Sequence, residues 1–310
     1  MCRRHVPLTA VDAPAELTGV TYRHFDGAGG VRLHCAEVGR ASGGRLPVVL
    51  LHGFPEFWYG WRHQIPALAA AGFHVLAPDL RGYNLSDKPR RISDYRIDLL
   101  AADVAAVVRD VAGVDGRAHV VGHDWGGVVA WHLAMHHPAA VEKLVVLNAP
   151  HPAAYLHELR RPTQLLRSWY AFFFQLPWLP EAAMRFNDFA SLRDLFRRGP
   201  ARAGAFTEAD IDRYVETFSR PGAVTSAINY YRAAFRAGAA RAKRAVRRID
   251  VPTLLIWGER DRYLVPELSD GLEPWVTNLR VERLPSATHW VQHDEPETVN
   301  RLLLRFLTSE

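Results

Sequence analysis

The segment GHDWG at residues 122–126 presents a carboxylate in a turn suited to covalent chemistry. It has the small-x-nucleophile-x-small form of a nucleophile elbow, a sharp turn between a strand and a helix. The small residues leave room for the chain to cross itself, and the turn pushes the central side chain out above the sheet. A carboxylate there can attack carbon and form an ester with the enzyme, and it is already ionised at neutral pH. The pattern predicts Asp124 as a nucleophile. The alternative is a structural aspartate in a helix-capping turn.

An ester on Asp124 must be hydrolysed, and hydrolysis needs a base. His289 lies in PSATHW, just after the last predicted strand, and Asp261 lies in WGERD, just after the strand before it. The chain order nucleophile, acid, histidine is the order expected for a nucleophile elbow on a sheet covered by helices. An aspartate bonded to one ring nitrogen fixes the tautomer and leaves the other nitrogen to activate water. We therefore predict His289 as the base and Asp261 as its acid, with Glu259 as the rival for the acid.

The segment His52-Gly53-Phe54-Pro55 follows the first predicted parallel strand. Glycine there lets the backbone turn its amides toward the nucleophile. The N–H groups of Phe54 and Trp125 are predicted to form an oxyanion hole, which acts when water attacks the ester carbonyl. A plain turn is the alternative.

These residues need a sheet to hold them together. The stretches Val20–Phe25 and Val31–Val38 are joined by a glycine-rich turn and predict a β-hairpin. After them, short apolar strands alternate with helical patterns, which indicates a parallel sheet covered on both faces. The predicted strands are Pro47–Leu51, Phe73–Ala77, Ala118–Val121 and Lys143–Leu147, and the predicted helices are 61–71, Asp94–Ala112 and Val128–His136.

The alternation stops near residue 150. Residues 151–246 hold no valine-rich strand, but contain helical patterns at Glu208–Phe218 and Val224–Phe235. Strands return with VPTLLIWGERD at 251–261 and LRVERLP at 279–285, and a last helix is predicted at Glu297–Leu307. We expect an α/β core at 20–150 and 247–310, interrupted by a helical cap at 151–246 over the usual ligand site of such folds.

Composition bounds the remaining possibilities. The 310 residues are 48% apolar and 23% charged, which is ordinary for a globular protein and excludes a disordered, coiled-coil or collagen-like chain. The net charge of +5 comes without a nucleic-acid recognition motif, so no nucleic-acid partner is expected. No phosphate loop or dinucleotide fingerprint is present, so no organic cofactor is expected. His132 and His136 lie four apart but lack a third ligand, so helix packing is expected rather than a metal site.

The two cysteines, Cys2 and Cys35, cannot form a disulfide framework. The N-terminus is basic but has no apolar signal stretch, and no run approaches the roughly 20 apolar residues that span a bilayer. A cytoplasmic protein without a transmembrane segment is therefore expected. The sequence leaves the oligomeric state open between monomer and homodimer.

Several longer segments carry a family resemblance. HGFPEFWYGWRHQIPALAAAGFHVLAPDLRGYNLSDKP, GHDWGG, NAPHP, RSWYAFFFQLPWLPE, SAINYYRA, WGERD and SATHW look like the epoxide hydrolase branch of the α/β-hydrolase superfamily. The similarity covers about residues 20–308. It implies an α/β-hydrolase fold with a helical cap, and an enzyme acting on ether bonds that converts an epoxide and water to a vicinal diol without a cofactor.

The same resemblance implies two cap tyrosines that hydrogen-bond the epoxide oxygen. Tyr170 stands five residues before Gln175 in the first family motif, and Tyr231 in NYYR matches the second. Opening an epoxide develops an alkoxide, and phenols of pKa about 10 can stabilise it or give it a proton. Tyr230 is the competitor for the second role.

Two other readings remain open. Haloalkane dehalogenases share a tryptophan after the nucleophile, here Trp125, but typically carry Asn where Phe54 stands. Fluoroacetate dehalogenases carry arginines after the nucleophile, which this chain lacks. A ligand-binding relative without turnover is the third reading. The basic run 232–248 is expected to be a solvated helix or linker.

Overall fold

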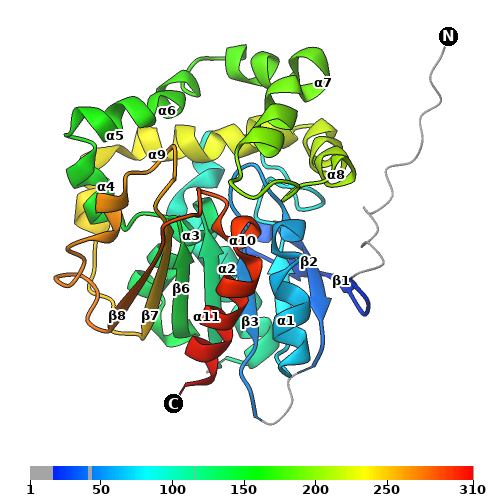
Figure 1. Cartoon of the computed structure of the whole chain (residues 1–310), viewed down its shortest axis with the longest axis vertical. Helices are drawn as coiled ribbons and strands as arrows, with labels where there is room; N and C mark the ends of the chain where they lie inside the picture. The colour runs from blue at the N-terminus through cyan, green and yellow to red at the C-terminus, as the bar shows by residue number, and fades with distance from the viewer. Residues whose placement is uncertain (1–16, 41–43, 115, 310) are drawn as a thin grey trace.

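An eight-stranded sheet forms the centre of the computed structural model, which describes residues 17–40, 44–114 and 116–309 (Figure 1). The strand order is β1-β2-β4-β3-β5-β6-β7-β8. β2 is antiparallel to β1 and β4, and the other neighbours are parallel. The strands are β1 (Thr21–Asp26), β2 (Arg32–Val38), β3 (Val48–Leu51), β4 (Val75–Pro78), β5 (Ala118–His123), β6 (Val141–Leu147), β7 (Thr253–Gly258) and β8 (Leu279–Leu284). The predicted fold class, a mostly parallel sheet opened by a hairpin, is confirmed.

The central strands are short apolar runs because both faces of the sheet are covered. Every residue of β3, β4, β5 and β7 is buried. In Figure 1, α1 (Gln64–Ala70) and α11 (Pro296–Thr308) lie in front of the sheet, while α2 (Ile97–Ala112) and α3 (Trp125–His136) lie behind it. Such two-sided burial removes the polar alternation of an exposed strand. The sheet is therefore a rigid base whose strand ends can hold side chains in fixed positions.

One predicted boundary is wrong in an informative way. The helix after the elbow was expected at Val128, but α3 begins at Trp125. Gly126 and Gly127 have low helix propensity, which placed them in the turn. Both glycines lie in the first turn of α3. An added Cβ on Gly126 would stand 2.1 Å from the Leu51 carbonyl oxygen, so no larger residue fits there. Close packing of helix against strand, and not the turn itself, requires these glycines.

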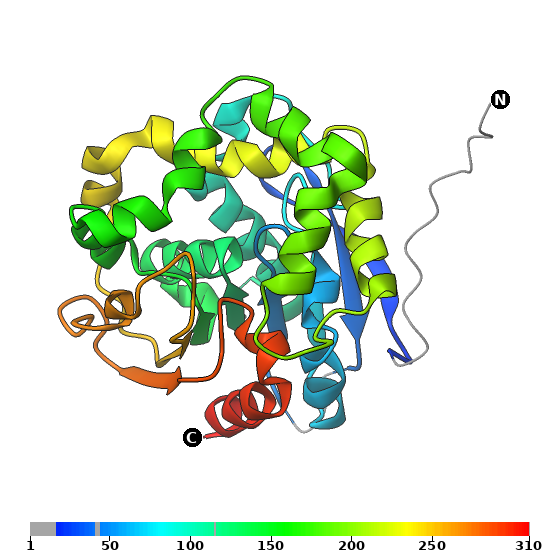
Figure 2. The same cartoon turned by 45° about the horizontal axis from the view of Figure 1, so that its top comes forward.

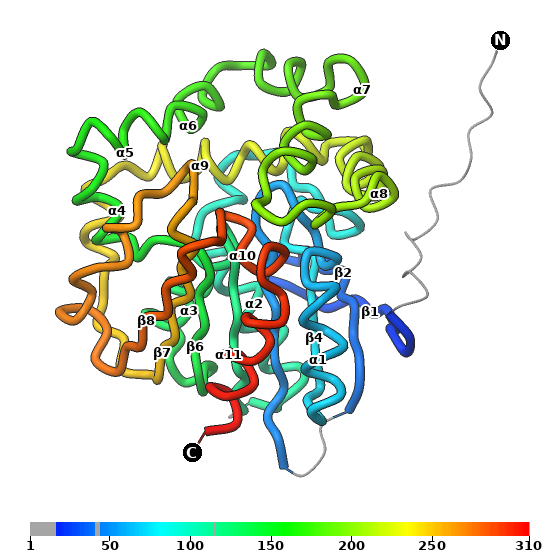
Figure 3. Tube along the Cα trace, viewed as in Figure 1, coloured from blue at the N-terminus to red at the C-terminus, as the bar shows by residue number. Residues whose placement is uncertain are grey.

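Between β6 and β7 the chain forms a helical insertion over one end of the sheet, as the tube in Figure 3 shows. Figure 2 brings this end forward and shows the helices spread across it. The helices are α4 (Pro152–Glu158), α5 (Pro162–Arg167), α6 (Trp169–Phe173), α7 (Leu179–Arg198), α8 (Glu208–Ser219) and α9 (Ala223–Ala245). α7 is interrupted at residues 186–189 and α9 at Gly238. In the described part of the chain, no helix combines the length and the apolar composition needed to cross a bilayer.

Candidate active site

Asp124 occupies a strained turn between β5 and α3. Its backbone lies at φ 49° and ψ −120°, a conformation that residues other than glycine rarely adopt. The turn is held by close packing, since a Cβ on Gly122 would meet the Gly126 carbonyl oxygen at 2.4 Å. The strain persists only because the surrounding strand and helix determine it. The carboxylate therefore projects from the end of β5 into the space under the insertion.

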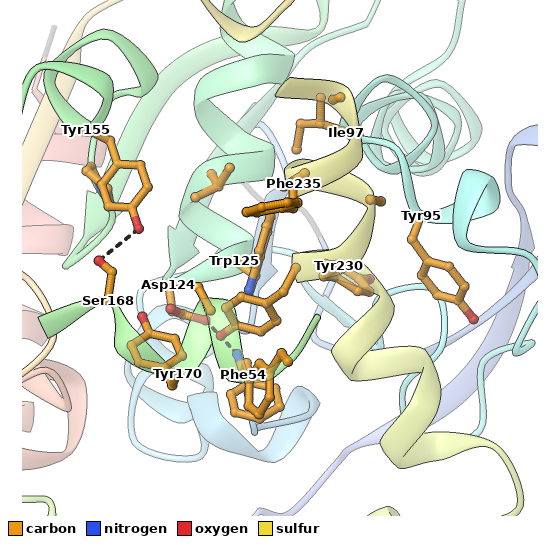
Figure 4. A pocket seen from close by; sticks show the side chains of 18 of the residues that line it. Phe54, Tyr95, Ile97, Asp124, Trp125, Tyr155, Ser168, Tyr170, Tyr230 and Phe235 are labelled. Carbon is orange, nitrogen blue, oxygen red and sulfur yellow. Dashed lines mark hydrogen bonds between the residues drawn. The ribbon is translucent and has the colours of Figure 1, made fainter. Parts of the chain in front are cut away.

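Two backbone amides lie beside this carboxylate. The Phe54 N–H donates to Asp124 Oδ1 at 2.7 Å, a contact that Figure 4 marks with a dashed line. Gly53 allows the approach, because a Cβ there would stand 2.4 Å from the Asp124 Cβ. The Trp125 amide is at the first position of α3, where no intrahelical acceptor exists. Both predicted oxyanion-hole amides thus belong to the chain segments that border Asp124.

The structure brings His289 and Asp261 to the same point. His289 Nε2 lies 3.5 Å from Asp124 Oδ2, and His289 Nδ1 lies 2.7 Å from Asp261 Oδ2. Asp261 follows β7, and its other oxygen accepts the amides of Tyr263 and Leu264. A fully occupied carboxylate of this kind is an orienting group, because its bonds fix both its own position and the tautomer of the imidazole.

Charge at the site controls the protonation of the imidazole. Burial lowers the pKa of His289, but the carboxylates of Asp261 and Asp124 outweigh that effect and raise the pKa to about 10. Burial conversely raises the pKa of Asp261, while the charge of His289 and its hydrogen bonds lower it overall. The resting site therefore holds an imidazolium between two carboxylates at neutral pH.

Asn148 is a site residue that the sequence reasoning missed. It follows β6, donates to Asp261 Oδ2 at 2.8 Å and accepts from the Gly258 amide at 2.8 Å. Its position directly after a buried strand, beside the ends of β5 and β7, was the signal that could have revealed it. It adds one more fixed hydrogen bond to the acid that orients His289.

Glu56 is a second residue whose place the sequence did not reveal. It is 1% exposed and lies 3.2 Å from His123 Nδ1 and 2.8 Å from His293 Nε2. His123 Nε2 in turn lies 2.8 Å from the His289 carbonyl oxygen. Burial raises the pKa of Glu56, but the contacts with His293 and His123 reverse this and hold it well below its ordinary value. A buried hydrogen-bonded cluster thus supports the backbone that carries His289.

A cavity of about 1380 Å³ lies between the Asp124–His289 pair and the insertion. Asp124, His289, Tyr170 and Tyr231 all line it. The rings of Tyr170 and Tyr231 meet edge to face at 5.8 Å, and Figure 4 shows Tyr170 beside Asp124. Burial and the nearby Asp124 charge raise the pKa of Tyr231 well above its usual value, and burial does the same for Tyr170. Both phenols are therefore neutral hydrogen-bond donors.

The structure distinguishes Tyr231 from its neighbour. The Tyr230 hydroxyl donates to the Arg81 carbonyl oxygen at 2.7 Å, and its ring packs against Tyr83 and Tyr95. The Tyr231 ring instead packs edge to face against Trp125 at 5.0 Å and Phe54 at 5.5 Å, and burial together with the Asp124 charge raises the pKa of its hydroxyl. The Tyr230 hydroxyl is thus bound to the backbone, whereas the Tyr231 hydroxyl is the one on which the Asp124 charge acts.

The expectation for the basic run is wrong at its first member. Arg232 is buried, and its guanidinium bonds both carboxylate oxygens of Glu181, at 2.6 and 3.1 Å, and the carbonyl oxygens of Phe174 and Leu176. The sequence could not show this because Glu181 is 51 residues away. Arg232 therefore joins α9 to the segment that follows Tyr170.

His132 and His136 stack at 4.2 Å on α3, and His136 Nε2 contacts the Ala245 carbonyl oxygen at 2.8 Å. Within residues 17–40, 44–114 and 116–309, no group of three or more histidine, cysteine or acidic side chains could hold a metal ion. Cys35 is buried and unpaired, and Cys2 lies outside the described residues.

Comparison with known proteins agrees with this geometry. The model for the α/β-hydrolase fold family matches residues 47–296. The chain belongs to the α/β-hydrolase family. The chain is 43% identical, over 92% of its length and 98% of the relative's, to the AB hydrolase superfamily protein YfhM of Bacillus subtilis. It is 39% identical to Epoxide hydrolase 4 of Homo sapiens, over 91% of this chain and 77% of that protein.

Solved structures place this α/β hydrolase in the branch that contains the epoxide hydrolases. A mutant epoxide hydrolase from Bacillus megaterium, crystallised with its diol product, matches with a TM-score of 0.83 at 34% identity. The match covers 93% of this chain and 100% of that one. An epoxide hydrolase from Vigna radiata matches with a TM-score of 0.77 at 27% identity, over 94% of this chain and 98% of that one.

Proposed function

We propose that this α/β hydrolase is an epoxide hydrolase that adds water to an epoxide through an ester on Asp124. The observation that carries the proposal is the pair of neutral phenols, Tyr170 and Tyr231, in the cavity that Asp124 enters. Phenols can donate to an epoxide oxygen while a carboxylate attacks the ring carbon from the opposite side. In this scheme residues 151–246 act as a cap over the 20–150 and 247–310 core.

The contacts of Asp124 assign a role to each of its oxygens. Oδ1 already accepts the Phe54 amide, so it becomes the carbonyl oxygen of the ester. Oδ2, on the side of His289, is the nucleophile. It forms the new C–O bond as the epoxide C–O bond breaks, a tyrosine gives its proton to the ring oxygen, and the His289 imidazolium returns a proton to that tyrosine and becomes a neutral imidazole. The product of this step is a hydroxyalkyl ester.

Hydrolysis then uses the other half of the site. His289, oriented by Asp261, takes a proton from water, and the hydroxide attacks the Asp124 carbonyl carbon. The amides of Phe54 and Trp125 stabilise the oxyanion, and such a donor is typically worth about 10²–10³-fold in rate. The ester C–O bond breaks, and the leaving oxygen takes the proton of the new Asp124 carboxyl group. The diol then leaves, Asp124 is again a carboxylate, and His289 keeps the proton from water as the resting imidazolium.

A single-turnover experiment in water labelled with heavy oxygen tests this route. Attack of water on the ester carbonyl puts the label into Asp124 and leaves the first diol unlabelled. In His289→Gln the ester should persist and increase the protein mass by that of the substrate. Label in the first diol, with no adduct in the variant, would show that water attacks the epoxide directly.

A paired assay separates epoxide and dehalogenase activity. Styrene oxide and aliphatic epoxides are scored for diol, and haloalkanes and fluoroacetate for halide release. We expect diol without halide, because Phe54 offers no side-chain donor for a halide and the Tyr170 and Tyr231 phenols line the cavity with Asp124. Halide without diol would reverse the assignment. Unchanged ligand recovered from a tight complex would favour a binding protein.

The cytoplasmic location expected from the sequence stays a prediction. Fractionation of the cells that produce the protein would test it.

A further inference from the structure

Large exposed apolar side chains are concentrated in the insertion. Of ten such exposed residues in the described chain, all but Val114 lie on α5, α6, α7, α9 or the link between α6 and α7. We name this set the apolar cap face: Leu165, Leu166, Trp169, Phe172, Leu176, Trp178, Leu179, Phe186 and Phe235. The rings of Phe172 and Phe235 meet at 6.1 Å, which joins α6 to α9. So many exposed large apolar groups in one part of a surface indicate an interaction site.

Basic residues predominate around this face, and the exposed Asp188, two residues after Phe186, is paired with Arg193. In the described segments 159–187 and 233–248 the one acidic residue is Glu181, which is buried and paired with Arg232. Three exposed arginines border the apolar residues, and we name Arg160, Arg185 and Arg236 the basic rim. In the described part of the chain none of the three has an ion-pair partner. Like charges on the same face of a second copy would repel, whereas an anionic surface would be attracted.

The cavity reaches this same face. Trp169, Phe172 and Phe235 line the cavity of Asp124 and are also 63%, 48% and 57% exposed. A side chain that is both exposed and part of a cavity wall stands at the mouth. Figure 4 shows Phe235 above Trp125 in that cavity. The route to the nucleophile thus opens among the exposed aromatics.

We propose that the apolar cap face docks on an anionic lipid bilayer, with the cavity mouth toward the lipid. Aromatic and leucine side chains beside arginines are the pattern of a protein surface that binds at a membrane interface, where apolar groups enter the acyl boundary and cations meet the headgroups. Resting on the proposed function, this orientation names the substrate class as lipophilic epoxides dissolved in the bilayer. The docking itself does not depend on that activity.

Vesicle sedimentation of the purified full chain tests the docking. Vesicles of phosphatidylcholine with about one-third phosphatidylglycerol are compared with phosphatidylcholine alone, because anionic lipid attracts basic residues. Replacing Leu166, Trp178 and Phe186 by serine, none of which lines the cavity, should weaken binding at least ten-fold. Replacing the basic rim by serine should weaken it roughly a hundred-fold, at about five-fold for each arginine.

Matched controls remove similar groups elsewhere. Val114→Ser takes away an exposed apolar residue, and serine at Arg109, Arg117 and Arg301 takes away three charges on α2, before β5 and on α11. These controls should sediment as the wild type does. Turnover of a water-soluble epoxide should be unchanged in every variant, while turnover of a vesicle-dissolved epoxide should fall in the two cap-face variants.

The vesicle experiment can overturn or support the docking of the apolar cap face. Wild type that stays in the supernatant with anionic vesicles would overturn the docking, as would cap-face variants that bind like wild type. A change of oligomeric state in these variants, with vesicle binding kept, would make the face a contact between copies and also overturn it. Vesicle binding by a chain that turns over no epoxide would support the docking and defeat only the proposed function.

Discussion

Replacing Arg232 by methionine should destabilise the insertion and slow turnover together. Arg232 follows Tyr231 in α9, and it bonds the carbonyl oxygens of Phe174 and Leu176 at the end of the segment that carries Tyr170. The same guanidinium holds Glu181 at 2.6 Å. Loss of this side chain removes the link between the two elements that bear the tyrosines.

The size of the effect follows from burial. Arg232 and Glu181 are 8% and 7% exposed, so removing one partner leaves a buried carboxylate without compensation. Breaking a buried pair in this way costs about 3–5 kcal/mol, whereas replacing both partners by apolar groups is often close to neutral. Each carbonyl left without a donor costs about 1 kcal/mol more if water cannot reach it. We expect a loss of about 4–7 kcal/mol for Arg232→Met, from the broken pair and the two carbonyls, and of about 1–2 kcal/mol for Arg232→Met with Glu181→Leu, from the carbonyls alone.

Urea unfolding of the wild type, the two single variants and the double variant gives the coupling energy. Arg236→Met, one turn further along α9 and exposed, is the matched control and should change stability by less than about 0.5 kcal/mol. The kcat of Arg232→Met should fall about 10- to 100-fold, since a displacement near 1 Å is enough for this. Arg232→Met that loses no more unfolding free energy than the control would contradict a role for the buried pair. A double variant that loses the sum of the two single losses would show that Arg232 and Glu181 are not coupled.

Other changes test separate parts of the site. Tyr231→Phe should lower kcat about 10²-fold. Tyr230→Phe should keep kcat and lose about 1 kcal/mol of stability with its bond to a backbone carbonyl; equal kcat values would contradict the assignment. Because folding raises the pKa of His289 from 6.5 to about 10, its contribution to stability is complete below pH 6.5 and is lost as pH rises through about 10. Urea midpoints of wild type and His289→Gln should therefore converge across that range, and a constant difference would argue against the shift. Gly126→Ala, whose Cβ would stand 2.1 Å from the Leu51 carbonyl oxygen, should lose more than about 3 kcal/mol, and a circular dichroism melt near that of the wild type would refute the packing argument.

The sequence predicted the sheet because its signals are local. A run such as VVLL at β3 is apolar at every position, which predicts a buried strand. In a helix such as α2, the spacing of the apolar residues predicts which face is buried. The same alternation places Asp124, Asp261 and His289 after strands of one parallel sheet, whereas the order of the strands was not predicted. The elbow motif predicted Asp124, whose backbone has a strained positive φ of 49°.

The missed residues are those whose partners are distant in the chain. Glu56 contacts His293 across 237 residues, and Asn148 contacts Asp261 across 113. Neither contact leaves a spacing pattern. The choice between Tyr230 and Tyr231 was also beyond the sequence, because it depends on which hydroxyl the Arg81 carbonyl oxygen accepts.

The charge of Asp124 links the two halves of the proposed reaction. In the resting site the carboxylate lies 3.5 Å from His289 Nε2 and helps to hold the imidazole in its protonated form. Ester formation removes that charge, so the pKa of His289 falls, because burial now opposes Asp261 alone. The imidazole becomes a base only after the substrate is attached. Return of the carboxylate restores the imidazolium, and the chemistry of one side chain thereby sets the protonation state that each step requires.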